Sequence, residues 1–214
     1  MERLSTLINC DELPPDFLPV SNIDTQAPER QRRIVIAYDH SDNSDATFAK
    51  VIRLGLISPK DEIYIVHIIE QRELQNIFAP IFQHTGMNKP LGNSEVATTA
   101  HTITEGLLHE IRKVLMTNGF ENVTTEAVLG DPKQSMIDYC QACKPDFLIC
   151  SPRGLNPVQK MVLGSTSSFL IKNIPCPVLI CKLTAQELEE RKKYNHVKTQ
   201  RFEHLIGAIK EKYK

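Results

Sequence analysis

The sequence predicts an α/β fold with an open, five-stranded and mostly parallel sheet and helices on both faces. Short, continuous apolar runs rich in β-branched residues recur along the chain, as is typical of strands that are buried on both faces. Segments with apolar residues at three- and four-residue spacings separate these runs, and turn residues mark the junctions. Such alternation indicates successive βαβ units and therefore a parallel sheet.

Length and composition fit one well-buried domain with extensions. The chain has 214 residues, of which 41% are hydrophobic and 24% charged, as in ordinary soluble domains. A formal net charge of −1 creates no overall field that would attract nucleic acid or an anionic membrane. No apolar run reaches the length of a membrane span, and residues 1–10 are too polar for a signal peptide. We therefore expect a cytoplasmic or nuclear protein with neither nucleic acid nor a membrane as partner.

The N-terminal part predicts an extended arm and then the first βα unit. Four prolines among residues 1–31 disfavour regular structure in the arm. Ile34–Tyr38 is a β-branched apolar run and predicts the first strand. The polar cluster at 39–44 supplies turn and N-cap residues for a helix that ends before Ser58-Pro59.

The middle of the chain predicts two strands and a long helix. Glu62–Ile69 predicts the second strand, and residues 70–92 predict a long irregular connection, because prolines and glycines interrupt them. Apolar residues then recur with helical spacing from about residue 94 to the helix stop Asn118-Gly119. Val123–Leu129 predicts the third strand.

The last part of the chain completes the sheet and adds a charged extension. We expect a helix over 134–143, a strand over 146–151, a helix over 165–173 and a strand over 177–181. The domain then covers residues 32–183. Residues 184–214 form the extension, in which helical spacing of apolar residues from about Thr199 predicts an amphipathic helix that packs on this domain or on a partner.

The cysteines favour free thiols over a metal or disulfide framework. Cys140 and Cys143 form a single C-x-x-C within a predicted helix, without the second pair or the paired histidines of a structural zinc site. We expect both to be buried or half-buried helix residues.

Polar residues after the predicted strands are the candidate site residues, because ligands of open parallel sheets lie at the carboxyl ends of the strands. Either Asp39 is a carboxylate that faces a ligand, or Asp39 or Asp42 merely caps the following helix. Arg153 either neutralises a phosphate or lies on the surface. Gly164 and Ser165 either hold an anion on the unpaired N–H groups of a helix start or only cap that helix.

Familiar catalytic and phosphate-binding motifs are absent from the sequence. It contains neither the P-loop pattern, nor G-x-G-x-x-G after the first strand, nor the G-x-S-x-G of a nucleophile elbow. His67 lies within an apolar strand, where a core histidine is more common than a base. The residues therefore do not indicate a dedicated enzyme.

Several segments together resemble the universal stress protein family over about residues 32–183. The resemblance rests on Ile34–Ser41, Val66–Ile68, Val128–Pro132 and Asp146–Ile149. The ATP-binding branch of that family carries Gly-x-x-Gly-x9-Gly-Ser/Thr. This sequence keeps the spacing, with nine residues between Gly154 and Gly164-Ser165. It departs from the pattern at the first glycine position, where Ser151 stands and Pro152 follows.

The resemblance implies a Rossmann-like fold of the adenine nucleotide alpha hydrolase type and a regulator of stress response or signalling that binds ATP, with Mg²⁺. It places Ala37 and Asp39 at the adenine and ribose end and Ile68 in the base pocket. The residues that would surround the phosphates are Gly154, Gly164, Ser165, Thr166 and Ser167, with Arg153 nearby. Ser151 completes the binding residues at the first glycine position. The resemblance also implies a homodimer through the last strand and at most slow ATP hydrolysis.

Two alternatives stay open at this point. Ser151, Pro152 and the two extensions also fit a dimerising interaction module that has lost nucleotide binding and contacts a protein partner through its termini. A weak ATP hydrolase is the other alternative.

Overall fold

The computed structural model describes residues 31–70, 93–151 and 165–193, which from Arg32 on belong to one compact unit. Three predicted features lie outside the described residues: the N-terminal arm, the connection over 71–92 and the amphipathic helix from about Thr199. The description below refers only to the described part of the chain.

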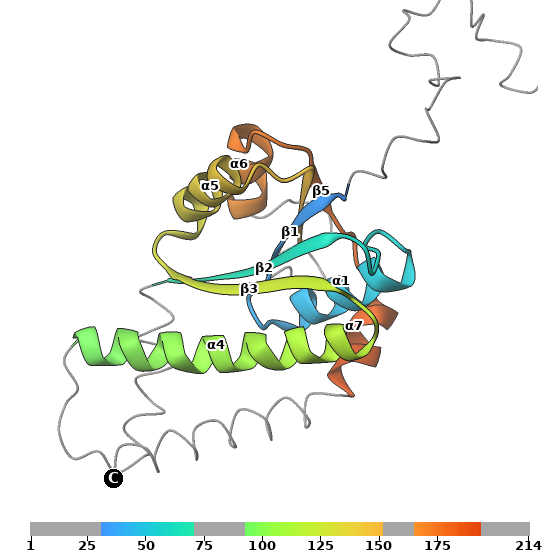
Figure 1. Ribbon diagram of the computed structural model, residues 1–214, viewed down its shortest axis with the longest axis horizontal. Coiled ribbons are helices and arrows are strands. Elements are labelled where there is room, and N and C mark those ends of the chain that lie inside the picture. Colours follow the sequence, from blue (N-terminus) through green and yellow to red (C-terminus); the bar gives the residue numbers. More distant parts are fainter. Residues whose placement is uncertain (1–30, 71–92, 152–164, 194–214) are drawn as a thin grey trace, which may run out of the picture. The chain divides into compact units, whose positions relative to one another are not determined.

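The sheet has five strands in the order β3-β2-β1-β4-β5, and every pairing between neighbours is parallel (Figure 1). The strands are β1 (Arg33–Ala37), β2 (Glu62–Ile69), β3 (Asn122–Leu129), β4 (Phe147–Cys150) and β5 (Val178–Ile180). Each overlaps a predicted strand, so the predicted fold class is confirmed. The chain steps outward from β1 to β3 and then returns to add β4 on the other side of β1. The switch point therefore lies between β1 and β4, where Ala37 pairs with Cys150.

Four helices connect the described strands, a fifth follows β5, and local capping explains where several of them begin and end. They are α1 (Asp42–Arg53), α4 (Asn93–Thr117), α5 (Pro132–Cys143), α6 (Ser165–Asn173) and α7 (Ala185–Lys192). Ser41 caps α1, and Asp131 caps α5 ahead of Pro132, whose missing N–H costs nothing at that position. Gly119 adopts a φ of 88° just after α4, a left-handed conformation that glycine tolerates best.

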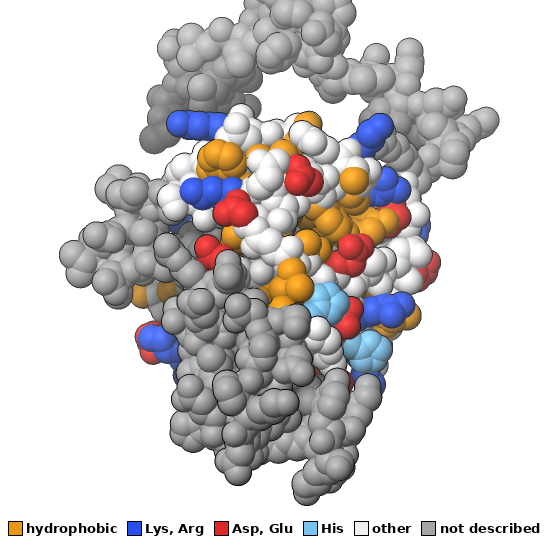
Figure 2. Space-filling model, turned by 90° about the vertical axis from the view of Figure 1, so that its left-hand side faces the viewer, with side chains coloured by type: hydrophobic (Ala, Val, Ile, Leu, Met, Phe, Trp, Pro, Cys, Tyr) orange, Lys and Arg blue, Asp and Glu red, His pale blue; other side chains and the backbone are white. Residues whose placement is uncertain are grey.

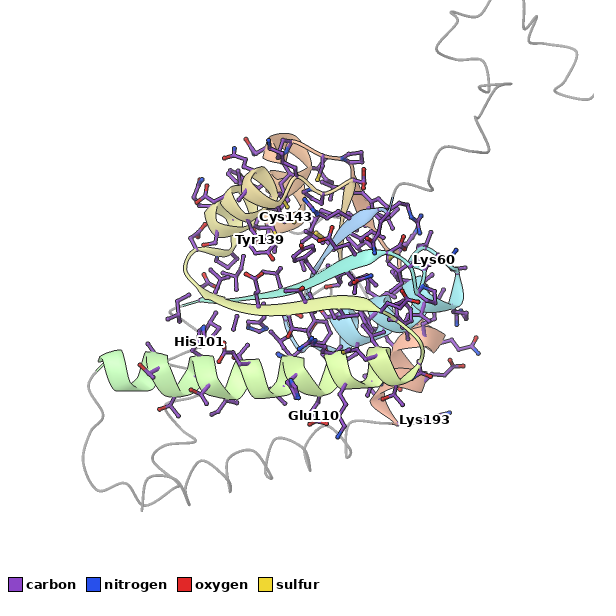
Figure 3. The ribbon with its side chains drawn as sticks, in the orientation of Figure 1. Lys60, His101, Glu110, Tyr139, Cys143 and Lys193 are labelled. Carbon is purple, nitrogen blue, oxygen red and sulfur yellow. The ribbon has the colours of Figure 1, made fainter. Side chains whose placement is uncertain are left out.

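The helices cover the sheet as two layers. On one face, Val51 of α1 and Leu108 and Leu115 of α4 pack against the aliphatic side chains of the central strands. On the other face, α5 and the end of α6 form a second core around Met136, Cys140 and Leu170. Figure 3 shows Tyr139 and Cys143 of α5 on one side of the sheet and His101 and Glu110 of α4 on the other. Helices on both faces bury the central strands β1, β2 and β4, which explains their continuous apolar runs.

Helix α7 lies where the sequence predicted only a charged extension before Thr199. None of its residues is buried, so it lacks the apolar periodicity by which the other helices were recognised. Its start is nevertheless encoded: the Thr184 hydroxyl accepts from the Glu187 N–H, and the Glu187 carboxylate accepts from the Thr184 N–H. This capping box is a helix signal that hydrophobic periodicity does not detect.

Two further sequence-based expectations can be compared with the described residues. Cys140 is buried and Cys143 half-buried in α5, as expected, and the cysteines at 140, 143, 150, 176 and 181 are free thiols. Within the described ranges, no helix combines the length and the apolar character that crossing a membrane requires.

Candidate functional site

A pocket opens at the switch point, at the carboxyl ends of β1, β2 and β4. Side chains and backbone from three strands and two helices line it: Ala37, Tyr38, Asp39, Val66, Ile68, Pro132, Met136, Cys150, Ser151, Thr166, Ser167 and Leu170. Figure 2 views the molecule from the side toward which β2 and β3 run and shows hydrophobic side chains exposed there among acidic and basic ones. The location is the one that open parallel sheets use for ligands.

The turn from β1 to α1 is ordered around the Asp39 carboxylate. One oxygen of Asp39 accepts hydrogen bonds from the Ser41 N–H at 3.1 Å, the Ser41 hydroxyl at 2.6 Å and the Ser44 hydroxyl at 2.5 Å. Ser41, in turn, accepts from the Ser44 N–H at 3.1 Å as the N-cap of α1. The alternative in which Asp39 or Asp42 caps α1 is therefore wrong, because a serine between them takes that position and Asp39 holds the serine.

A bridge between two serines ties the end of β4 to this turn. The hydroxyl oxygens of Ser44 and Ser151 lie 3.0 Å apart. Because the single hydroxyl hydrogen of Ser44 is directed to Asp39, Ser151 is the donor in this contact. Ser151, at the first glycine position of the family pattern, therefore donates its hydroxyl hydrogen to Ser44 of the same chain. This contact lies beside the pocket that Ser151 lines.

The first turns of α5 and α6 close the opposite side of the pocket. Thr166 and Ser167 line it from α6, and Pro132 lines it from α5. The first turn of α6 carries no acidic residue, so the partial positive charge of that helix start is not offset by a carboxylate from its own turn. Ser165 begins α6 but does not line the pocket. The predicted residues Arg153, Gly154 and Gly164 lie outside the described residues.

The structure thus brings six of the ten predicted site residues to one pocket, namely Ala37, Asp39, Ile68, Ser151, Thr166 and Ser167. Whether they bind a nucleotide stays a prediction. Sequence reasoning missed the apolar part of the wall, formed by Val66, Pro132, Met136, Cys150 and Leu170. Strand-end position would have indicated Cys150, the last residue of β4. Val66 lies within β2 and Met136 within a helix, so neither carries such a signal.

Two ionisable groups of the wall are held in their neutral forms. Burial raises the pKa of the Cys150 thiol to about 12, so this thiol is not a nucleophile at neutral pH. Burial, followed by the nearby Asp45 carboxylate, raises the pKa of Tyr38 above its usual range, and its hydroxyl donates a hydrogen bond to Asp45. Tyr38 was not predicted as a site residue. These groups shape the pocket and do not supply reactive charge.

Comparison with known proteins identifies the relatives of this chain. The sequence profile of the universal stress protein family matches residues 31–182. A universal stress protein A-like protein of Arabidopsis thaliana is 40% identical over 58 residues, which are 27% of this chain and 33% of that protein. A Staphylococcus haemolyticus protein named as a universal stress protein is 26% identical over 153 residues, 71% of this chain and 84% of its own length.

A solved universal stress protein shows the same fold. The universal stress protein UspA from Lactobacillus plantarum superposes with a TM-score of 0.50 at 19% identity, over 72% of this chain and 99% of that one. A universal stress protein family protein from Arabidopsis thaliana, solved with AMP bound, gives a TM-score of 0.49 at 20% identity, over 73% of this chain and 94% of that one.

Proposed function

The chain belongs to the universal stress protein family, and from this premise we propose that it binds an adenine nucleotide, ATP with Mg²⁺, in the pocket between β1 and β4. Binding of the nucleotide, rather than its turnover, is the proposed activity, as expected of a stress-response or signalling regulator. The observation that carries the proposal is the convergence of three kinds of group on one pocket: an apolar wall, a carboxylate and a hydroxyl-bearing helix start.

Each kind of group suits one part of a nucleotide. Val66, Ile68 and Met136 offer an apolar surface for the base. The Asp39 carboxylate is an acceptor for ribose hydroxyls at the end of β1, the role that an acidic residue plays in other α/β nucleotide sites. Thr166 and Ser167 bring hydroxyls and the N-terminus of α6, which favours phosphate. Mg²⁺ would be held mainly by the phosphates themselves.

The experiment is isothermal titration of the full-length chain with ATP, with and without Mg²⁺. We expect saturable binding that Asp39→Ala weakens at least about tenfold, because hydrogen bonds to a charged group contribute roughly 1.5–3 kcal/mol. Asp138→Asn is the matched control, since Asp138 is exposed on α5 and accepts a hydrogen bond from Gln134 of the same helix. Absence of binding up to millimolar ATP would refute the proposal.

An interaction module without nucleotide is the second candidate, and the Ser44–Ser151 contact favours it. This contact places a side chain in the pocket wall where the ATP-binding branch has glycine. If it blocks the phosphates, Ser151→Gly should create ATP binding that the native chain lacks. Nucleotide that copurifies with the native protein would eliminate this candidate.

Assembly and location stay predictions. β5 is an edge strand, and edge strands present unpaired backbone groups to a further strand, which is compatible with the proposed homodimer. Light scattering after size-exclusion chromatography measures the mass directly, and a monomer at micromolar concentration would contradict it. The proposed cytoplasmic location is checked by imaging a tagged full-length chain.

A further inference from the structure

Helix α7 lies beyond the part of the chain that the family profile matches, yet it is built into the domain. The match ends at residue 182, and α7 covers Ala185–Lys192. α7 packs against α1, the helix that leaves the Asp39 turn (Figure 1). A segment outside the family domain is therefore in contact with an element that builds the candidate site.

The N-terminal turn of α7 is fastened to the last turn of α1. The Glu187 carboxylate accepts from Lys50 at 3.0 Å and from Arg53 at 2.6 Å. Lys50 also donates to the Lys182 carbonyl oxygen at 2.6 Å. The Glu187 side chain is only 15% exposed, so this cluster is screened less than a free surface pair.

The C-terminal turn of α7 reaches the first turn of α1. Arg191 donates to one oxygen of Asp45 at 2.9 Å, and the other oxygen accepts from the Tyr38 hydroxyl. The Asp45 side chain is 7% exposed, and a carboxylate at that depth requires charged or hydrogen-bonding partners. Tyr38 lines the pocket and directly precedes Asp39. A continuous chain of contacts thus leads from α7 to the pocket wall.

We propose that Arg191 is a positioning residue for the nucleotide site. By pairing with Asp45 it holds the first turn of α1, in which the adjacent Ser44 donates to Asp39 and contacts Ser151. The proposal rests on the nucleotide binding proposed above. Linkage requires the reverse effect as well: a bound nucleotide favours the docked position of α7. The segment after the family domain is therefore an allosteric element, and its docking and nucleotide binding promote each other.

The first test compares two charge-removing changes on the same helix. Arg191→Gln removes the cation that faces Asp45, whereas Lys192→Gln removes a cation that bonds Glu189 on α7 itself. In titrations of the full-length protein with ATP, we expect Arg191→Gln to weaken binding about tenfold, an ordinary coupling between two sites. Lys192→Gln should leave the affinity unchanged within about twofold, as for most surface pairs. Equal affinities of Arg191→Gln and the unaltered protein would overturn the proposal.

Two further readouts separate positioning from general stability. Arg191→Lys keeps a cation opposite Asp45 and should restore most of the affinity, and it also serves if Arg191→Gln does not fold. Asp45→Asn combined with Arg191→Gln should weaken binding no more than the larger single change, because both remove one interaction. Additive losses, or no rescue by lysine, would contradict action through Asp45.

Hydrogen exchange tests the reverse direction of the coupling. ATP should slow exchange of the α7 amides in the unaltered protein and have no such effect in Arg191→Gln. If the unaltered protein binds no ATP, the proposed function fails, and the positioning role is judged by the Ser41 and Ser44 amides alone. Faster exchange at these amides in Arg191→Gln than in Lys192→Gln supports the role, and equal exchange refutes it.

Discussion

The two faces of the sheet hold their helices by different means. On the α1 and α4 face, large aliphatic side chains form a closed core that includes Leu108 and Leu115, and charged side chains join α7 to its outside. On the α5 and α6 face, the core is also aliphatic, with Leu148 and Leu170, but it includes Met136 and the buried thiols of Cys140 and Cys150. This second core shares Met136, Cys150 and Leu170 with the pocket, whereas Tyr38 is the buried residue that the first core contributes to it.

The difference indicates a division of labour between the faces. The α1 and α4 face contributes mainly to stability. It also holds Asp39 in place, because the preceding Tyr38 donates a hydrogen bond to Asp45 of α1. On the α5 and α6 face, the core side chains Met136, Cys150 and Leu170 line the pocket and are available to a ligand. The same type of substitution on the two faces should therefore affect different quantities, the free energy of unfolding on the α1 and α4 face and the ATP affinity on the α5 and α6 face.

The largest expected effect comes from the same substitution made in both cores. Leu108→Ala removes a fully buried side chain from the closed core and should destabilise the protein by about 2–5 kcal/mol without changing the ATP affinity of the folded protein. Leu170→Ala truncates a side chain that is 3% exposed and lines the pocket. It should destabilise less, because the space it leaves joins the pocket, and should change the affinity. Urea unfolding and ATP titration measure the two quantities, and identical profiles would remove the distinction between the faces.

The centre of the sheet could be predicted closely from the sequence, because β1, β2 and β4 are largely buried and so appear as continuous apolar runs. Ile34–Tyr38 and Glu62–Ile69 locate β1 and β2 to within one residue. Strand-end position likewise indicated Asp39 and Ser151, since the carboxyl ends of parallel strands converge. α7 escaped because a helix without buried residues shows no apolar periodicity.

The rest of the site depends on contacts that no local pattern encodes. Met136 and Leu170 are ordinary apolar helix residues until tertiary packing directs them to the pocket. The pair of Asp45 and Arg191 joins residues 146 positions apart, and neither residue type nor spacing distinguishes it from the other charges of the chain. The N-cap of α1 could likewise not be predicted, because Asp39, Ser41 and Asp42 are all suitable residue types and aspartate and serine are comparable N-cap residues.

A smaller effect is expected from the helix caps of the two faces. Ser41→Ala on α1 and Asp131→Ala on α5 each remove an N-cap side chain and should each destabilise the protein by about 1 kcal/mol. Ser41 also donates to Asp39, so Ser41→Ala should weaken ATP binding in addition. Asp131→Ala is the control: it removes a helix cap of similar strength on the other face and should leave the ATP affinity unchanged. An equal loss of affinity in both variants would show that general loosening, and not the Asp39 turn, governs binding.

The smallest effect concerns the charged contact that fastens α7 to the closed face. The Thr184 N–H, with Lys50 and Arg53, lowers the pKa of Glu187 from 4.5 to about 2. Because the pKa is lower in the folded state, Glu187 stabilises the fold fully at neutral pH, and this contribution is lost as the pH falls from about 4.5 to about 2. Glutamine can still accept the Thr184 N–H, and the Arg53 partner is 60% exposed, so Glu187→Gln should cost only about 1 kcal/mol or less at pH 7. The stability of this variant should approach that of the unaltered protein at low pH. Urea midpoints across this range measure the difference, with the exposed Glu189→Gln as control. A difference that persists at low pH would mean that α7 is held by Glu187 packing and not by its charge.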